Sequence, residues 1–568
     1  MLIVAVPTLS SVLVVLKKKL EEQPSTPTSP WRVCLYLDEA ATGNLLKVDQ
    51  TRKAWLLYWA PLEFGEECLA HANNWLLLGC LRTHDCQKNQ GGISAVVRKI
   101  LNTYFSGDQP NFFTTGVLIR DNESTLGPLF AKFEFLVADE SALSGVWRTK
   151  GASGNSPCLH CLNVCRTAAD LPAHDRRGYL VDISEIDTTK FHLHTDASVY
   201  EVCDKLLAAS AADLPALEKA FGIHLDQQGL LFDVGLRAHV RPISHTMLDF
   251  AHIFLVHGVA HFTMTLFMDA CKAVGVQGRH VHDWFQAWSW PRSEKNPPRS
   301  IFNAARCKHF DFRAGASEVL SMYPVFLEFT KAIIPAGAIP EARKCLEALC
   351  EVLDAWKTYQ GGKLSPRELD DAIRKHHSLF VEAFGKYECK PKHHFALHLG
   401  DVLRRHQLLQ TTFVPERRHK DYKEVATSIK IGVGFGGACT RKLLNKQITD
   451  MQNPLLFARG VFMQDVLAKF PNTLVDVLPL GDWKAAKTII QHGLSTSVGD
   501  VIAVEQQSVV TVCCVEALLQ RNQQEFYICA TTCTPAIGGR WKKRTRWRSC
   551  TLLATRGLEY GPRLLSAI

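Results

Sequence analysis

The stretch VCLYLD at residues 33–38 decides the fold, because it is an apolar strand that ends in a carboxylate, Asp38. The stretch FEFLVAD at residues 133–139 repeats the arrangement and ends in Asp139. A carboxylate at the carboxyl end of a central strand usually faces a site rather than a core. The alternative, that each Asp is a turn residue or a helix cap just past a strand, stays open at this point.

The segments around these strands indicate a mixed α/β core. Apolar runs at residues 54–64, 75–81 and 113–119 predict further strands, and residues 93–105 have the spacing of an amphipathic helix. We therefore predict an α/β fold in which helical segments interrupt a mixed sheet. The expected parts are a leading segment and linker (1–30), the first part of the core (31–150), an irregular Cys/His-containing region (151–240), a helical insertion (241–410), a closing helical part of the core (411–470) and a small β-rich C-terminal module (471–568).

The composition is that of a large globular protein in a reducing compartment. The 568 residues are 46% hydrophobic and 21% charged, the net charge is +9, and the nineteen cysteines are scattered and odd in number. This excludes a disulfide scaffold and suits, without requiring, a polyanionic partner. The apolar start is too short to span a bilayer and has its lysines behind it, so we expect no membrane role. Walker-type, Gly-x-Ser-x-Gly and kinase motifs are absent from the sequence.

Cys158 and Cys161 form a candidate zinc half-site, because a Cys-x-x-Cys pair supplies two of the four ligands of a tetrahedral zinc ion. The second pair would come from elsewhere, such as Cys165 with His174, or from His252 folding back. Two unligated thiols are the alternative.

The pair Asp249 and His252 lies three residues apart, so both side chains share one face of a predicted helix. The carboxylate could then fix the tautomer of the imidazole beside a ligand. On the spacing alone, an Asp cap next to a satisfied core histidine is the better explanation of the pair. A second spacing of this kind, His257 and His261, is a weaker candidate for metal binding.

Two basic stretches are candidates for nucleic-acid contact. Arg417, Arg418 and Lys420 follow Glu416, an acid near the start of a predicted helix. The second stretch, RWKKRTRWR at residues 540–548, combines cations for phosphates with indoles that stack on bases, and also fits a nuclear-import signal. Its candidate contact residues are Arg540, Trp541, Lys542, Lys543, Arg544 and Trp547.

Taken in order, these motifs resemble the catalytic region of Plavaka and Kyakuja–Dileera–Zisupton transposases, and more distantly CACTA and hAT transposases. The strings that carry the resemblance are Leu37-Asp38, Ala138-Asp139-Glu140, Cys158-x-x-Cys161, Asp249-x-x-His252, KHHF at residues 392–395 and ERRHK at residues 416–420. Together they cover residues 31–429.

The resemblance implies an RNase H-like core with a helical insertion and a DDE-type transposase that cleaves and joins DNA. Asp38, Asp139 and Glu416 would hold two Mg²⁺ ions for in-line displacement at phosphorus. Cys158, Cys161, Asp249 and His252 would be accessory positions near that core. Nearby rivals for the third acid are Glu382, Glu388 and Glu424. DNA would be the partner, in the nucleus, and self-association is left open.

One departure from that family supports an alternative function. Only 37 residues precede Asp38, and they resemble neither a zinc-binding nor a helix-turn-helix segment. A degenerate, catalytically inactive DNA-binding protein is therefore the alternative to an active enzyme. A zinc-stabilised protein-interaction module is a third possibility.

Overall fold

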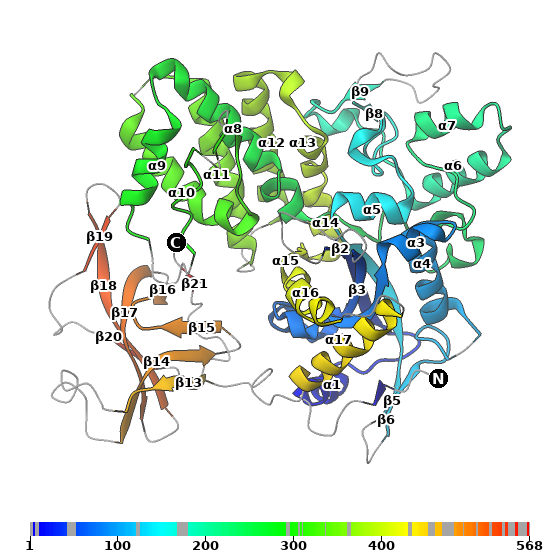
Figure 1. Cartoon of the computed structure of the whole chain (residues 1–568), viewed down its shortest axis with the longest axis horizontal. Helices are drawn as coiled ribbons and strands as arrows, with labels where there is room; N and C mark the ends of the chain where they lie inside the picture. The colour runs from blue at the N-terminus through cyan, green and yellow to red at the C-terminus, as the bar shows by residue number, and fades with distance from the viewer. Residues whose placement is uncertain are drawn as a thin grey trace. The chain divides into compact units, whose positions relative to one another are not determined.

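A computed structural model gives the fold of the 568-residue chain (Figure 1). The residues that it describes are 4–5, 11–41, 53–108, 110–120, 125–166, 180–290, 296–304, 307–308, 311–335, 337–360, 365–429, 434–451, 461–468, 482–491, 494–506, 509–521, 525–536, 540–543, 551–554 and 565–566. The chain divides into two compact units. Unit 1 comprises residues 1–259 and 385–457, and unit 2 comprises residues 260–384 and 458–568.

The centre of unit 1 is a five-stranded mixed sheet in the order β10-β7-β2-β3-β4. Strands β2, β3 and β4 form an antiparallel meander, whereas β7 and β10 run parallel to β2. The unit is therefore α/β, as the sequence predicts. The strands are β2 (Trp31–Ala40), β3 (Ala54–Pro61), β4 (Leu76–Arg82), β7 (Ala131–Val137) and β10 (Thr246–Met247).

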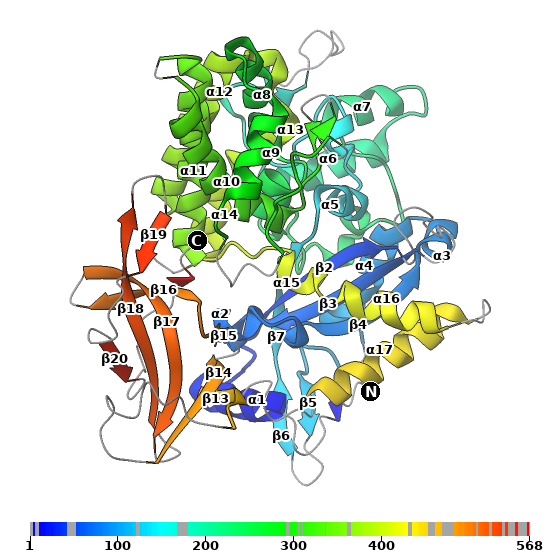
Figure 2. The same cartoon turned by 60° about the vertical axis from the view of Figure 1, so that its left-hand side comes forward.

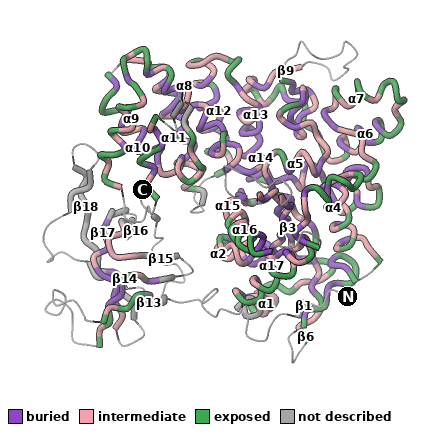
Figure 3. Tube along the Cα trace, in the orientation of Figure 1, coloured by how far each residue is buried: buried purple, intermediate pink, exposed green. Residues whose placement is uncertain are grey.

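The central strand β2 is apolar on both of its faces because helices cover both sides of the sheet. Val33, Leu35 and Leu37 point to one side, and since side chains alternate along a strand, Tyr36 and Asp38 point to the other. Buried residues run through the strands and the helices that pack on them (Figure 3). The face of Tyr36 is thus the face on which a site can form.

Different segments of the chain cover the two faces (Figure 2). Helices α4 (Gly92–Leu101) and α5 (Glu140–Trp147) contribute to the core on the Leu35 side. Helices α16 (His419–Ser428) and α17 (Phe435–Met451), from the second stretch of unit 1, contact β2 and β4 on the Tyr36 side. The returning stretch therefore covers the face that carries Asp38.

Residues 245–275, at the start of the expected helical insertion, do not form one continuous helix. The chain there forms β10, then a π-helical turn at Ala251–Leu255, and then helix α8 (Val259–Cys271). Strand β10 has only two residues and lies inside an apolar run, so it shows no alternation of hydrophobic and polar residues from which a strand could be predicted. Strand β10 places Asp249 just past the carboxyl end of a parallel strand.

Unit 2 contains a group of long helices, α9 (Gly278–Ala287), α10 (Ala316–Ile333), α11 (Pro340–Gln360) and α12 (Pro366–Phe384). These helices belong to residues 260–384, the first stretch of unit 2. The helical insertion was expected over the wider range 241–410. Among the described residues, one helical stretch, Ala251–Val274, is long and apolar enough for a membrane span, but 67% of it is buried within the protein, as in a core helix.

The C-terminal part of unit 2 contains a sheet of nine strands. Its longest members, β17 (Val509–Arg521) and β18 (Glu525–Ala536), pair antiparallel, and Val515, Leu518 and Ile528 lie in a small apolar cluster. The others are β13 (Val461–Val466), β14 (Trp483–Gln491), β15 (Leu494–Ser497), β16 (Val501–Gln506), β19 (Arg540–Lys543), β20 (Thr551–Ala554) and β21 (Leu565–Ser566).

Arg418 fixes the position of α16 inside unit 1. Its side chain is only 3% exposed, and Nη1 donates to Asn73 Oδ1 at 2.7 Å and pairs with Asp421 at 3.1 Å and Asp450 at 3.8 Å. A buried guanidinium with three such partners is not available to a DNA phosphate. The prediction that Arg418 contacts nucleic acid is therefore replaced by a structural role.

We expect Arg418→Met to lower the free energy of unfolding by roughly 3 kcal/mol, because it leaves two carboxylates without their buried partner. Urea unfolding of the purified chain measures this loss. The matched control is Arg417→Met on the exposed neighbouring position, which should change stability by less than about 0.5 kcal/mol. Equal stability of the two variants would contradict the structural role.

Candidate functional site

Asp38 lies near the carboxyl end of β2 and belongs to a group that fixes its orientation. The backbone N–H of Glu39 donates to Oδ1 at 2.6 Å, and the Tyr36 hydroxyl donates to Oδ2 at 3.3 Å. Tyr36 also contacts His419 Nε2 at 3.2 Å, and His419 Nδ1 is 3.8 Å from Asp38 Oδ2. Strand β2 and helix α16 together set the position of this carboxylate.

Asp139 follows β7, the parallel neighbour of β2, and is the N-cap of α5. Its Oδ1 accepts a hydrogen bond from the backbone N–H of Ala142 at 2.6 Å. The helix-cap reading of Asp139 is therefore correct for one carboxylate oxygen. The cap also holds the side chain rigidly at the end of the sheet, so the same residue can serve a site with its second oxygen.

Glu416 reaches the same region from the second stretch of unit 1. It is the last residue of the short helix α15 (Phe413–Glu416), four residues after Thr412, so both side chains lie on one helix face. The Thr412 hydroxyl lies 2.7 Å from Glu416 Oε1 and 2.8 Å from Asp249 Oδ2. Thr412 thereby connects the late acid to the end of β10.

Asp249 and His252 form the pair that the spacing suggested. His252 Nδ1 lies 2.6 Å from Asp249 Oδ2, and Nε2 lies 3.8 Å from Glu416 Oε1. Asp249 Oδ1 accepts the backbone N–H of Ala251 at 3.0 Å. The Asp249 side chain is only 1% exposed, so this buried carboxylate orients His252 and is closed to an ion arriving from solvent.

The charges of the three acids act on one another. Burial raises the pKa of Asp38 to about 7, with added repulsion from Asp139 and Glu416. Burial also raises the pKa of Glu416, to which Asp249 and Asp139 contribute. Burial alone would lower the pKa of His252, but its hydrogen bond to Asp249 and the nearby Glu416 and Asp139 outweigh it and raise the pKa. Neighbouring carboxylates that repel one another in this way favour the approach of a cation.

The other acids considered do not compete for this place. Glu39 pairs with Lys53, and Glu140 Oε1 accepts the backbone N–H of Ala152 at 2.6 Å. The rivals of Glu416 point to solvent: Glu382, Glu388 and Glu424 are all exposed. Glu416 is the late acid whose charge raises the pKa of Asp38.

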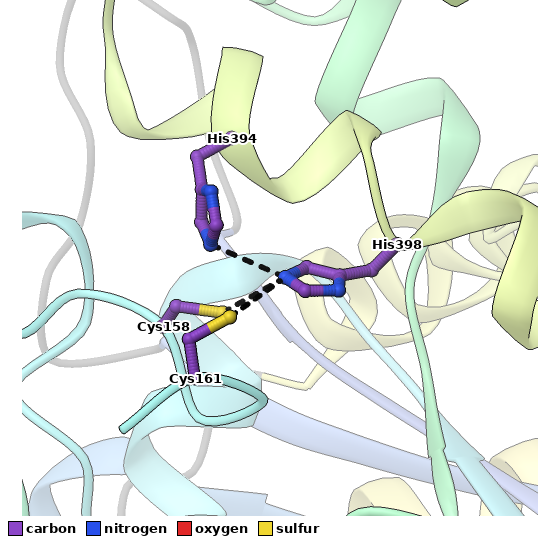
Figure 4. A group of neighbouring side chains, drawn as sticks. All are labelled: Cys158, Cys161, His394 and His398. Atoms are coloured by element: carbon purple, nitrogen blue, oxygen red, sulfur yellow. Dashed lines mark hydrogen bonds between the residues drawn. The ribbon is translucent and has the colours of Figure 1, made fainter. Parts of the chain in front are cut away.

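A second cluster in unit 1 brings Cys158 and Cys161 to His394 and His398 (Figure 4). Their four ligand atoms lie within 4.8 Å of one another, and all four residues are buried. His398 Nε2 is 3.4 Å from Cys158 Sγ, 3.3 Å from Cys161 Sγ and 3.2 Å from His394 Nε2. The cysteines come from a turn, and the histidines come from α13 (Pro391–Ala396) and the N-cap of α14 (Leu399–His406).

These residues fit a structural metal such as zinc. A tetrahedral zinc ion with two sulfur and two nitrogen ligands holds those atoms about 3.3–3.8 Å apart, close to the distances here. Burial works against a Cys158 thiolate, but the Cys161 hydrogen bond and the imidazoles of His398 and His394 outweigh it and lower the pKa well below its ordinary value. A thiolate is the form that binds a metal.

The cluster corrects the expected zinc ligands. Its second pair is His394 and His398, which the sequence presents only as part of a basic stretch; their spacing of four on a helix is the signal that would have found them. His252 belongs to the acid site instead, held there by Asp249. Cys165 Sγ lies against Val181 O at 3.4 Å, and His174 lies outside the described residues.

The predicted nucleic-acid residues fall into three groups. Arg417 and Lys420 are exposed beside Glu416 and are free to meet phosphates, unlike Arg418. Arg540, Trp541, Lys542 and Lys543 form strand β19, which pairs with β18. Arg544 and Trp547 lie outside the described residues.

Sequence reasoning did not identify Thr412, Tyr36 or His419 as parts of the site. Tyr36 was visible only as an aromatic residue two positions before Asp38, on the same strand face. Thr412 and His419 flank Glu416 at separations of four and three residues, so they share the helical neighbourhood of the acid. No motif distinguishes a threonine that links two carboxylates from one on a helix surface.

We expect the purified protein to carry one zinc ion per chain, and Cys158→Ser to lose it. Because zinc binds the folded state, its loss should lower the melting temperature by on the order of 5 °C. Elemental analysis and calorimetry measure the two effects. The matched control is Cys165→Ser, a buried cysteine outside the cluster, which should keep its zinc. Full zinc content in Cys158→Ser would refute this assignment.

Comparison with known proteins does not place the chain in a family. No known family model matches it, and none of the curated proteins matches it. The functional argument therefore depends on the geometry of the two clusters.

Proposed function

We propose that the chain is a transposon-derived DDE-type transposase whose acid site, formed by Asp38, Asp139 and Glu416, binds Mg²⁺ and cleaves and joins DNA strands. The observation that carries the proposal is the electrostatic coupling of three acids that lie far apart in the sequence. The acids of a structural surface are normally neutralised by cations or separated. Here burial, together with repulsion from neighbouring acids, raises the pKa of Asp38 and of Glu416.

The position of the acids in the sheet supports the same function. The central sheet has three antiparallel strands followed by two strands parallel to the first, which supports the RNase H-like core that the transposase resemblance implies. Asp38 and Asp139 lie toward the same edge because β2 and β7 are parallel neighbours. Residues 260–384 leave unit 1 between the second acid and the third, as the transposase resemblance implies.

The donor set suits a hard divalent ion. Carboxylate oxygens are the protein ligands that Mg²⁺ prefers, and ionised Asp38, Asp139 and Glu416 would hold it. Among the described residues their oxygens do not all lie within 4.8 Å of one another as the Cys/His ligand atoms do, so bound ions would have to draw the carboxylates together. Bound ions would activate the attacking oxygen and stabilise the leaving oxygen of a phosphodiester.

The protein's own groups have separate tasks in this reaction. Asp139 is held in place by its cap on α5, and Tyr36 orients Asp38. His252, aligned by Asp249, presents Nε2 toward Glu416 and adds a partial positive charge beside the acids. Arg417 and Lys420 lie exposed next to Glu416, where they can bind backbone phosphates of DNA. We place this activity in the nucleus, with DNA as the partner.

We expect Asp139→Asn to reduce Mg²⁺-dependent cleavage of nicked or blunt DNA duplexes by about 1,000-fold or more, because it removes an ion ligand. Asparagine still caps a helix, so the melting temperature should be unchanged. The matched control is Glu140→Gln at the next position, which should retain cleavage. Gel analysis of end-labelled DNA measures the products.

Unchanged cleavage in Asp139→Asn would remove this mechanism. Salt-dependent DNA binding by the wild-type chain, without cleavage in Mg²⁺ or Mn²⁺, would favour the inactive DNA-binding protein instead. Absence of DNA binding at low salt would argue against both functions.

We also expect binding of Mn²⁺, as a substitute for Mg²⁺, to weaken below about pH 7. The folded protein holds the Asp38 proton up to about pH 7, whereas an exposed aspartate releases it near pH 4. A cation needs the ionised form, so its dissociation constant should rise about tenfold for each pH unit below 7 and level off above it. Titration calorimetry measures this slope, which Glu140→Gln should preserve; a constant affinity would contradict it.

A further inference from the structure

Helix α13 contacts two parts of unit 1. One of its residues belongs to the Cys/His cluster, and another binds the chain segment that leads from His252. His394 lies in the Cys/His cluster, whereas Lys392, two positions earlier, is rotated about 200° around the helix axis. Lys392 Nζ donates to the backbone carbonyls of Val256 at 2.9 Å and His257 at 3.2 Å. One short helix therefore joins the cluster to the segment that follows the π-helical turn.

The carbonyls that Lys392 binds belong to a tight reversal of the chain. The π-helical turn Ala251–Leu255 ends at Val256, and His257 adopts φ +44°, in the left-handed region that non-glycine residues rarely occupy. A Cβ on Gly258 would lie 2.2 Å from Ile253 O, so only glycine fits. Carbonyl groups at the end of a helical turn have no N–H partner within the helix. Here the ammonium group of Lys392 donates the hydrogen bonds to them.

The opposite end of this turn reaches the acids. Asp249 lies two residues before it and His252 is its second residue, and His252 Nε2 lies 3.8 Å from Glu416 Oε1. A turn of five residues has little freedom to absorb a displacement, so a shift of Val256 and His257 moves His252. The side chain of Lys392 is thus the contact through which α13 supports His252.

We propose that Lys392 is a positioning residue that makes the divalent-ion affinity of the acid site depend on zinc in the Cys/His cluster. Bound zinc would tie His394 and His398 to Cys158 and Cys161 and so fix α13. With α13 fixed, Lys392 holds the reversal at residues 256–258 and keeps His252 beside Glu416. The ion affinity in this proposal rests on the function proposed above, whereas the mechanical link rests on the hydrogen bonds alone.

The test compares wild type, Lys392→Met and Lys392→Arg in the full chain. With zinc content confirmed as equal, Lys392→Met should raise the dissociation constant for Mn²⁺ about tenfold, as expected when hydrogen bonds from a charged donor are lost. Arginine also donates to two carbonyls and should restore most of the affinity. The control is Lys386→Met, an exposed lysine on the same stretch, which should leave the affinity unchanged.

The link to zinc is tested by combining the variant with zinc removal. Removing zinc should weaken Mn²⁺ binding in wild type. In Lys392→Met it should cause little further loss of affinity, because both changes interrupt the same connection between the Cys/His cluster and His252. Hydrogen exchange should show amides of residues 253–258 exchanging faster in Lys392→Met with zinc bound. A merely structural role would lower the melting temperature and leave the Mn²⁺ affinity unchanged.

The outcomes separate this inference from the proposed function. Asp139→Asn must abolish Mn²⁺ binding if the acids hold the ion, and failure there would overturn the proposed function together with the coupling. Normal Mn²⁺ affinity in Lys392→Met, while Asp139→Asn abolishes binding, would overturn the inference alone. Fully additive effects of zinc removal and Lys392→Met would also overturn it.

Discussion

The site depends on one constraint, which is the repulsion among the carboxylates of Asp38, Asp139 and Glu416. These acids lie at the end of a sheet whose two faces are covered. Asp38 is held by the backbone of its own strand and by Tyr36, and Asp139 by its cap on α5. These fixed partners keep the side chains from relaxing away from one another. Burial, with added repulsion from Asp139 and Glu416, raises the pKa of Asp38, and a folded protein keeps such an arrangement chiefly where function requires it.

Solvent exposure within the site separates the proposed ion ligands from the residues that support them. Asp249 also follows a parallel strand of the sheet, and by position alone it would be a fourth ligand. Its two oxygens are instead engaged by Ala251, His252 and Thr412. Glu416 has one contact of this kind, from Thr412, and its side chain is 30% exposed, so it keeps room for a further partner. The Asp38 side chain is 20% exposed although both of its oxygens accept hydrogen bonds, whereas that of Asp249 is 1% exposed. Exposure, rather than position in the sheet, therefore distinguishes the support from the proposed ligands.

The sequence predicted the parts of the site that follow from strand periodicity. Asp38 and Asp139 end apolar runs long enough to mark strands, and the α/β class follows from them. It did not predict the partners of Cys158 and Cys161, because His394 and His398 are brought to them by tertiary packing across a long separation. The prediction that Arg418 contacts nucleic acid was wrong because the sequence shows that a residue is charged but not that it is buried. Strand β10 was too short to leave a period.

The return of the chain after residues 260–384 explains why the two clusters belong together. The stretch 385–457 supplies both histidines of the Cys/His cluster, Lys392 and Glu416, as well as the helices that cover β2 and β4. Closing a loop of this length costs about 4 kcal/mol of chain entropy. A metal that joins Cys161 to His394 would restrict the unfolded chain as a cross-link does and offset much of that cost. Since Glu416 arrives on the same stretch, the contacts that dock 385–457 also determine whether the third acid meets Asp38 and Asp139.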